Sequence, residues 1–224
     1  MRLRNYSFPG YSMKCSTSLW SADLANLAAD IKRVDPYSDR YHLDVADGHY
    51  VGSLLFFPDL VKSLRSHSRR PFEVHLTVTS PLNWIEPFVE AGADILMFCL
   101  NSHGNPAEVI EEIKSHGKQA AISLPVDEAV DRVEPFLDQL DTVTVMATSM
   151  GIKGAEMDAG VPRKVQGLRR LVSERGLATQ IEVDGGIRKH SVPLHSKAGA
   201  DFIVAGSLMF GDDPRAIRSW LDSL

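Results

Sequence analysis

The chain has 224 residues, 44% of them hydrophobic and 24% charged, which is an ordinary composition for a globular α/β protein with a large core. Its formal net charge of -5 argues against a nucleic-acid partner, because nucleic-acid-binding proteins normally present a basic face. No apolar segment follows Met1–Tyr6, and the longest apolar run, Ile95–Leu100, is far too short to span a bilayer. We therefore expect neither a signal peptide nor a membrane partner.

Both cysteines, Cys15 and Cys99, lie inside apolar runs. This placement favours reduced core residues in a cytoplasmic protein over a disulfide framework. Cys99 is expected near the end of a strand, yet no neighbour in sequence suggests an activated nucleophile.

Short apolar runs alternate with amphipathic stretches along the chain. Strands are predicted near Met13–Leu19, Arg40–Asp44, Phe72–Thr77, Ile95–Phe98, Ala120–Leu124, Thr142–Met146, Gln180–Val183 and Phe202–Ala205. The helical patterns include Ser21–Val34, Pro106–His116, Arg163–Arg175 and Asp213–Leu224. Ser21 and Asp213 are the expected N-caps of the first and last of these helices.

The predicted strands are apolar on both faces, which is typical of a parallel sheet covered by helices. Eight βα repeats in a chain of this size indicate a (β/α)₈ TIM barrel. We expect residues 13–224 to form this single domain and residues 1–12 to be an N-terminal extension. The alternative is an open doubly wound sheet, which usually shows a Gly-rich turn after its first strand. Here Leu19-Trp20-Ser21 follows instead.

Ionisable residues occupy positions that a buried strand rarely gives them. His42 and Asp44 lie two apart, so they point to the same face of their strand. His75 and Asp184 are similarly placed near the ends of two other strands. A single histidine of this kind is more often a satisfied core residue, but four such groups favour a metal site. Imidazole together with carboxylate suits one divalent ion of zinc, iron, manganese or cobalt better than magnesium or calcium.

Glycine-containing turns after the last three predicted strands suggest a phosphate site, because barrels often bind phosphate with backbone N–H groups in these loops. The candidate residues are Gly151, Ile152, Lys153 and Gly154, then Gly185 and Gly186, and finally Gly206 and Ser207. The alternative is that these are ordinary turn residues. Their position beside Asp184 makes the phosphate interpretation stronger.

A metal, two carboxylates and a phosphate site together favour chemistry beside the carbonyl of a sugar phosphate. A divalent cation on the ketone and its neighbouring hydroxyl lowers the cost of the enediolate that forms on proton loss. Carboxylates on opposite faces of that enediolate can remove a proton from one side and return one to the other. Asp44 and Asp184 are the candidates for this inversion.

The chain resembles the ribulose-phosphate 3-epimerase family over nearly its whole length after the extension. The segments that carry the resemblance are Ser18–Leu24, His42–Val51, Val74–Val78, Val183–Ile187 and Ala198–Ser207. Together they are highly specific, although each alone is not.

The resemblance implies a (β/α)₈ barrel of the ribulose-phosphate-binding type that epimerises ketose phosphates at C3 with a bound divalent metal. The family's metal ligands fall on His42, Asp44, His75 and Asp184, and its acid/base pair falls on Asp44 and Asp184. Its substrate-contacting residues fall on Ser18 and His75 and on the three phosphate loops. A homo-oligomer is also implied.

The surrounding substrate residues depart from the family pattern. Ala46 and Thr77 stand where the family commonly has methionine, while Met146 keeps one. Cys99 and Asn101 replace a histidine and a glutamate, Leu124 replaces an asparagine, and Lys153 replaces a glycine. Lys153 either contacts phosphate or faces solvent. We therefore expect the reaction to be retained on ribulose 5-phosphate or on a related hexulose or tetrulose phosphate.

Three alternatives compete with this prediction. A sugar-phosphate lyase or decarboxylase of a related barrel would carry Asp-x-Lys-x-x-Asp where this chain has His42–Asp47 without the lysine. A non-catalytic sugar-phosphate-binding protein fits the changed residues but not the four retained ligand positions. A metal-free isomerase does not explain two inward histidines beside two aspartates. Glu182, two residues before Asp184, is interpreted as a paired core charge in preference to a partner of a ligand.

Overall fold

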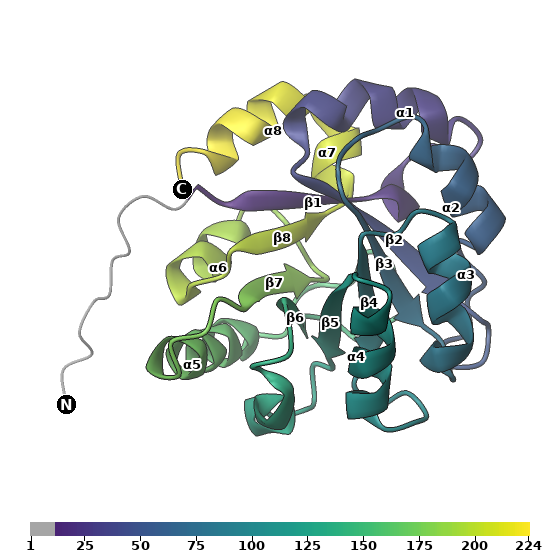
Figure 1. Ribbon diagram of the computed structural model, residues 1–224. Helices are drawn as coiled ribbons and strands as arrows, with labels where there is room; N and C mark the ends of the chain where they lie inside the picture. Colours follow the sequence, from purple (N-terminus) through teal and green to yellow (C-terminus); the bar gives the residue numbers. More distant parts are fainter. Residues whose placement is uncertain (1–11) are drawn as a thin grey trace.

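Eight parallel strands close into a barrel in the computed structural model, which describes residues 12–224 (Figure 1). Each strand pairs with the next along the chain, and β8 pairs with β1. The strands are β1 (Lys14–Ser18), β2 (Arg40–Ala46), β3 (Phe72–Thr77), β4 (Ile95–Cys99), β5 (Gln119–Leu124), β6 (Thr142–Met146), β7 (Gln180–Asp184) and β8 (Phe202–Ala205).

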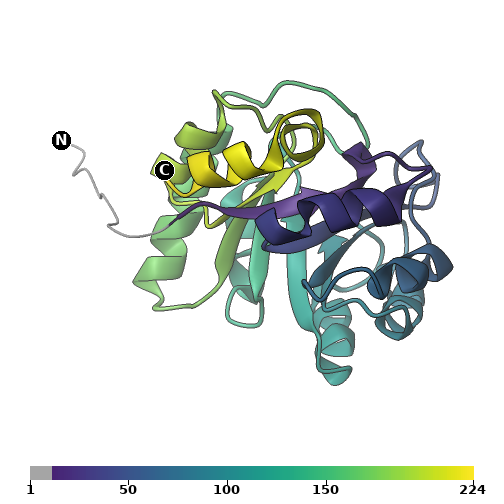
Figure 2. The same ribbon diagram turned by 90° about the horizontal axis from the view of Figure 1, so that it is seen from above.

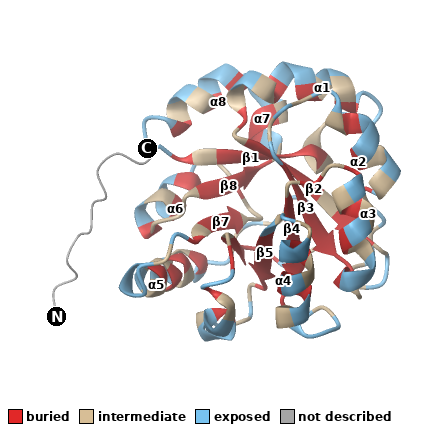
Figure 3. Ribbon diagram, viewed as in Figure 1, coloured by how far each residue is buried: buried red, intermediate tan, exposed pale blue. Residues whose placement is uncertain are grey.

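Helices surround the ring of strands (Figures 1 and 2). They are α1 (Leu27–Val34), α2 (Pro58–Arg65), α3 (Ile85–Glu90), α4 (Pro106–Ser115), α5 (Val161–Glu174), α6 (Val192–Ala198), α7 (Ser207–Gly211) and α8 (Pro214–Leu221). Short 3₁₀ segments are η1 (Leu19–Ser21), η2 (Asp35–Tyr37), η3 (Pro81–Trp84), η4 (Val130–Arg132) and η5 (Glu134–Phe136). The strands are almost wholly buried, and the helices expose their outer faces (Figure 3).

The predicted barrel is confirmed, and every predicted strand is present with ends that differ by at most two residues. The doubly wound alternative is wrong. The predicted extension lies outside the described residues except for Ser12, so the division at residue 12 stays a prediction. No helix within residues 12–224 is long and apolar enough to cross a membrane.

The first helix begins later than predicted. The chain forms η1 at Leu19–Ser21, and α1 starts only at Leu27, so Ser21 does not cap it. The Asp23 carboxylate explains the delay, because it accepts hydrogen bonds from the backbone N–H of Ala25 at 3.0 Å and from the Asn26 side chain at 2.8 Å. These local bonds hold a turn that competes with the helix. The Asp213 cap is confirmed, since its side chain accepts from the Arg215 N–H.

The connection from β5 to β6 contains two 3₁₀ turns, η4 and η5, where the repeat pattern predicts an α-helix. Pro135 lies within this segment and cannot donate the backbone hydrogen bond that a continuing helix needs.

Side-chain alternation along β2 and β3 separates the packing core from the barrel interior. Tyr41 and Leu43 are buried among the apolar residues between sheet and helices, and Tyr41 donates a hydrogen bond to the Ile31 carbonyl of α1. His42 and Asp44 point the opposite way, into the barrel. The strand register pairs Asp44 with His75, so these side chains lie at the same height.

Candidate active site and metal centre

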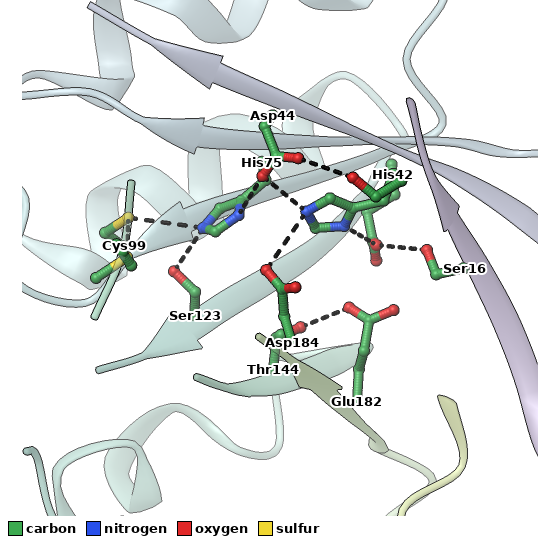
Figure 4. Close-up of polar contacts among 12 residues, drawn as sticks. Ser16, His42, Asp44, His75, Cys99, Ser123, Thr144, Glu182 and Asp184 are labelled. Carbon is green, nitrogen blue, oxygen red and sulfur yellow. Dashed lines mark hydrogen bonds and ion pairs between the residues drawn. The ribbon is translucent and has the colours of Figure 1, made fainter. Parts of the chain in front are cut away.

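Four predicted ligands meet at the carboxyl ends of β2, β3 and β7 (Figure 4). His42 Nε2 lies 3.3 Å from Asp44 Oδ1 and 3.8 Å from Asp184 Oδ2. His75 Nδ1 lies 3.6 Å from Asp44 Oδ1. One donor atom from each of the four side chains lies within 4.8 Å of all the others, a spacing that a single ion can bridge.

In each histidine, the ring nitrogen that points away from Asp44 contacts a different residue. His42 Nδ1 lies 2.9 Å from Glu73 Oε2, and His75 Nε2 lies 3.0 Å from Ser123 Oγ (the latter contact drawn in Figure 4). The other nitrogens, His42 Nε2 and His75 Nδ1, are buried, make no hydrogen bond and face Asp44. Buried polar atoms without partners are unfavourable, and a cation among these nitrogens and carboxylates would satisfy them. The cluster therefore suits a divalent metal ion.

The pKa values of Asp44 and Asp184 are shifted in opposite directions by their surroundings. Burial alone raises the pKa of Asp44, but the adjacent His42 and His75 rings outweigh it and hold that pKa well below its usual range. For Asp184 burial has the largest effect; although His42 opposes it, the pKa of Asp184 is raised above its ordinary value. Two carboxylates with pKa values pushed apart are a common arrangement for an acid and a base.

Nearby carboxylates raise the pKa values of both histidines. Burial lowers the pKa of His42, but Asp44 and Glu73 outweigh this effect and raise it well above its usual value. Burial also lowers the pKa of His75, yet Asp44 raises it to about 10. The electrostatic environment of the site therefore favours positive charge.

A cavity of about 240 Å³ opens beside the cluster. It is lined by Asp44, His75 and Asp184 from the cluster, by Ser18, and by every candidate phosphate-binding residue, namely Gly151, Ile152, Lys153, Gly154, Gly185, Gly186, Gly206 and Ser207. Ser18 Oγ donates a hydrogen bond of 3.1 Å to Asp44 Oδ2. The structure thus brings all predicted site residues to one end of the barrel, with His42 beneath the cavity.

Several of these loop glycines have no room for a side chain, as Gly185 and Gly206 illustrate. Gly185 has φ +97°, and a Cβ there would lie 2.4 Å from Thr148 Oγ1. A Cβ on Gly206 would lie 2.2 Å from Ser21 Oγ. Side chains would therefore displace the neighbouring loops that close this end of the cavity.

Two cationic side chains border the cavity. Lys153 Nζ donates to the Trp20 carbonyl at 2.8 Å, so the loop after β6 reaches across to the turn after β1 (Figure 2). Arg188 donates to the Ile187 carbonyl at 2.9 Å and to the Gly154 carbonyl at 3.3 Å. Among residues 12–224, no carboxylate forms an ion pair with either cation, which leaves their charge for an anionic ligand. Arg188 was absent from the residues predicted from sequence.

The residues that differ from the family pattern do not all line this cavity. Thr77 lines it, and Cys99 Sγ lies behind it, 3.7 Å from His75 Nε2. Ala46 instead lines a separate cavity of about 700 Å³ beneath the loops after β2 and β3. Ala46 therefore does not line the cavity beside the cluster. Cys15 and Cys99 are both free and buried, as predicted.

The fold and the site define a class: a (β/α)₈ barrel enzyme whose cluster suits a divalent metal and adjoins a cavity with unpaired cations. The model of the ribulose-phosphate 3-epimerase family matches residues 14–210, and the chain belongs to this family. It is accordingly an isomerase-class enzyme, a ketose-phosphate epimerase.

Relatives span nearly the whole chain. The chain is 37% identical over 207 residues to ribulose-phosphate 3-epimerase of Treponema pallidum, covering 92% of this chain and 95% of the relative. It is 35% identical over 205 residues to the Bacillus subtilis protein of the same name, covering 91% and 94%.

Solved barrels of other activities share the fold. A 3-hexulose-6-phosphate synthase matches with a TM-score of 0.67 and 17% identity, covering 94% of this chain and 99% of that one. A 3-keto-L-gulonate-6-phosphate decarboxylase from Vibrio cholerae matches with a TM-score of 0.70 and 15% identity, covering 96% and 97%. At such identities the likeness is one of fold.

Proposed function

We propose that the chain inverts C3 of a ketose phosphate, interconverting ribulose 5-phosphate and xylulose 5-phosphate or a related hexulose or tetrulose phosphate pair. The observation that carries this proposal is the placement of Asp44 and Asp184 around the same unpaired histidine nitrogen. Their pKa values are shifted in opposite directions. One carboxylate is thereby poised to accept a proton and the other to donate one.

His42, Asp44, His75 and Asp184 would hold the metal, which we propose to be zinc, iron, manganese or cobalt. When bound, such an ion supplies positive charge that stabilises the enediolate oxygens. Asp44 and Asp184 move the C3 proton. Ser18 orients Asp44 through its 3.1 Å hydrogen bond and borders the space for the sugar.

The phosphate group would lie against the three glycine-containing loops. Backbone N–H groups there can approach an anion closely because glycine has no side chain. Lys153 and Arg188 would contribute charge, exchanging the carbonyl oxygens that they now contact for phosphate oxygens. We also propose that the protein is cytoplasmic, on the basis of its two reduced cysteines, and that it forms a homo-oligomer, as its family resemblance implies.

Deuterium incorporation at C3, followed by NMR, tests the proposed reaction. The metal-loaded protein is incubated in D₂O separately with D-ribulose 5-phosphate, D-allulose 6-phosphate and a tetrulose phosphate. We expect exchange together with formation of the C3 epimer, fastest for the physiological sugar. Absence of exchange with all of them, with bound metal verified, would contradict the proposal and favour a binding protein. Carbon–carbon bond cleavage in place of exchange would favour a lyase.

Lys153→Ala tests the phosphate contact. We expect KM for the sugar phosphate to rise about 10-fold, because a charge-assisted hydrogen bond is lost from a solvent-exposed loop, while kcat changes little. The inhibition constant of inorganic phosphate should rise in parallel. Lys189→Ala is the matched control, since Lys189 is exposed and paired with Asp212 at 3.1 Å. Equal KM values for Lys153→Ala and the unmodified enzyme would place Lys153 outside the phosphate site.

A further inference from the structure

A layer of buried charge lies directly beneath the candidate metal centre. Arg40 of β2, Glu73 of β3 and Glu182 of β7 are 3%, 0% and 0% exposed. Arg40 Nη2 lies 2.6 Å from Glu182 Oε1 and 3.0 Å from Glu73 Oε1. A single guanidinium thus joins two carboxylates that would otherwise repel each other in the barrel interior.

We propose that Glu73, held in place by Arg40, is a positioning residue that directs His42 Nε2 toward the metal. Glu73 Oε2 lies 2.9 Å from His42 Nδ1. A carboxylate only accepts hydrogen bonds, so this contact requires the proton on Nδ1 and leaves the Nε2 lone pair for a cation. The orphaned, buried Nε2 between the carboxylates of Asp44 and Asp184 is where that lone pair is needed.

The position of Glu73 is determined from several sides. Ser16 Oγ of β1 donates to Glu73 Oε2 at 3.1 Å, and Arg40 pairs with the other oxygen of the same carboxylate. The Arg40 guanidinium in turn packs over the Phe202 ring at 3.9 Å. Glu182 binds the opposite side of Arg40. It also accepts a hydrogen bond from Thr144 Oγ1 at 2.8 Å, a contact drawn in Figure 4. These contacts leave Glu73 little freedom to turn away from His42.

The second histidine offers an internal contrast. His75 Nε2, the nitrogen that points away from Asp44, contacts the Ser123 hydroxyl, which is neutral. A carboxylate behind an imidazole increases its donor strength more than a hydroxyl does. We therefore expect His42 to be the stronger of the two histidine ligands. This inference rests on the proposed metal site but not on the identity of the sugar.

The test compares Glu73→Gln with Glu182→Gln. Glu182 is equally buried and binds the same Arg40, but it makes no hydrogen bond or ion pair with His42. Zinc affinity is measured by chelator competition, and the His42 Nδ1–H proton is observed by NMR in the zinc-loaded protein. We expect Glu73→Gln to weaken zinc binding by about 10- to 100-fold. The Nδ1–H resonance should move upfield. Glu182→Gln should change the affinity less than about 3-fold and leave that resonance in place.

If Glu73→Gln does not fold, Glu73→Asp provides a second test of the inference. The shorter side chain retains the charge beside Arg40 but withdraws the carboxylate from Nδ1, so zinc affinity should fall in the same way. Unchanged zinc affinity in the folded Glu73 variants, or equal losses for Glu73→Gln and Glu182→Gln, would overturn the inference. Failure of the unmodified protein to bind zinc, cobalt or manganese would overturn the proposed metal site itself.

Discussion

The variants Asp44→Asn and Asp184→Asn will each lower the rate of C3 epimerisation by about 10²- to 10⁴-fold. This is the range expected for loss of a positioned acid or base. Inversion needs a proton carrier on each face of the enediolate, so neither carboxylate substitutes for the other. Asn is nearly isosteric with Asp, so the fold should remain, and Ser18 can still contact the side chain at position 44. Epimer formation and C3 deuterium exchange are measured together by NMR.

Metal content must be verified in both variants, since each also removes a candidate ligand. Asp59→Asn, an exposed position at the start of α2, is the control for a change of charge alone. Near-normal epimerisation by either active-site variant with metal bound would exclude the two-carboxylate mechanism.

Chelation will abolish the activity, and restoring it will require more metal at lower pH. The pKa of His42 lies well above its usual value and that of His75 is raised to about 10, so both rings carry protons at neutral pH. A cation must displace a proton from His42 Nε2 and from His75 Nδ1. Metal binding therefore releases protons, and affinity should rise by about 10-fold per pH unit for each histidine that deprotonates.

Competition titrations at pH 6, 7 and 8, corrected for protonation of the chelator, measure this dependence. Calorimetry in buffers of different ionisation enthalpy gives the number of protons released independently. An affinity that does not change with pH would show that the two histidine nitrogens are not ligands.

The four-residue cluster was predictable from sequence because strand alternation is a strong rule. His42 and Asp44 lie two apart, so they necessarily share a face, and a buried charged pair requires a partner. The same rule predicts that Glu73 and His75 share a face of their strand, but it does not predict which residue Glu73 contacts. That contact depends on the register between β2 and β3, which pairs Glu73 with His42. Glu182, interpreted as a paired core charge, does pair with Arg40.

Other features could not be read from local sequence. Ser123 looks like any small residue of a buried strand, and its contact with His75 arises from barrel closure across β3, β4 and β5. Arg188 reaches the cavity only because the loop after β7 lies against Gly154. The delayed start of α1 follows from hydrogen bonds of the Asp23 side chain, which hold a turn where the sequence pattern predicts a helix.

The charged layer beneath the cluster also limits how far this barrel can be made resistant to heat. Barrel interiors are normally filled by branched apolar side chains. Replacing a buried ion pair such as Arg40–Glu182 by apolar residues of similar volume is often neutral or stabilising. Selection or engineering for melting temperature alone would therefore favour repacking these positions. Loss of Arg40 would then leave Glu73, the residue that positions His42, without its ion-pair partner. A thermostable variant of this enzyme has to gain its stability at the outer helices and loops instead.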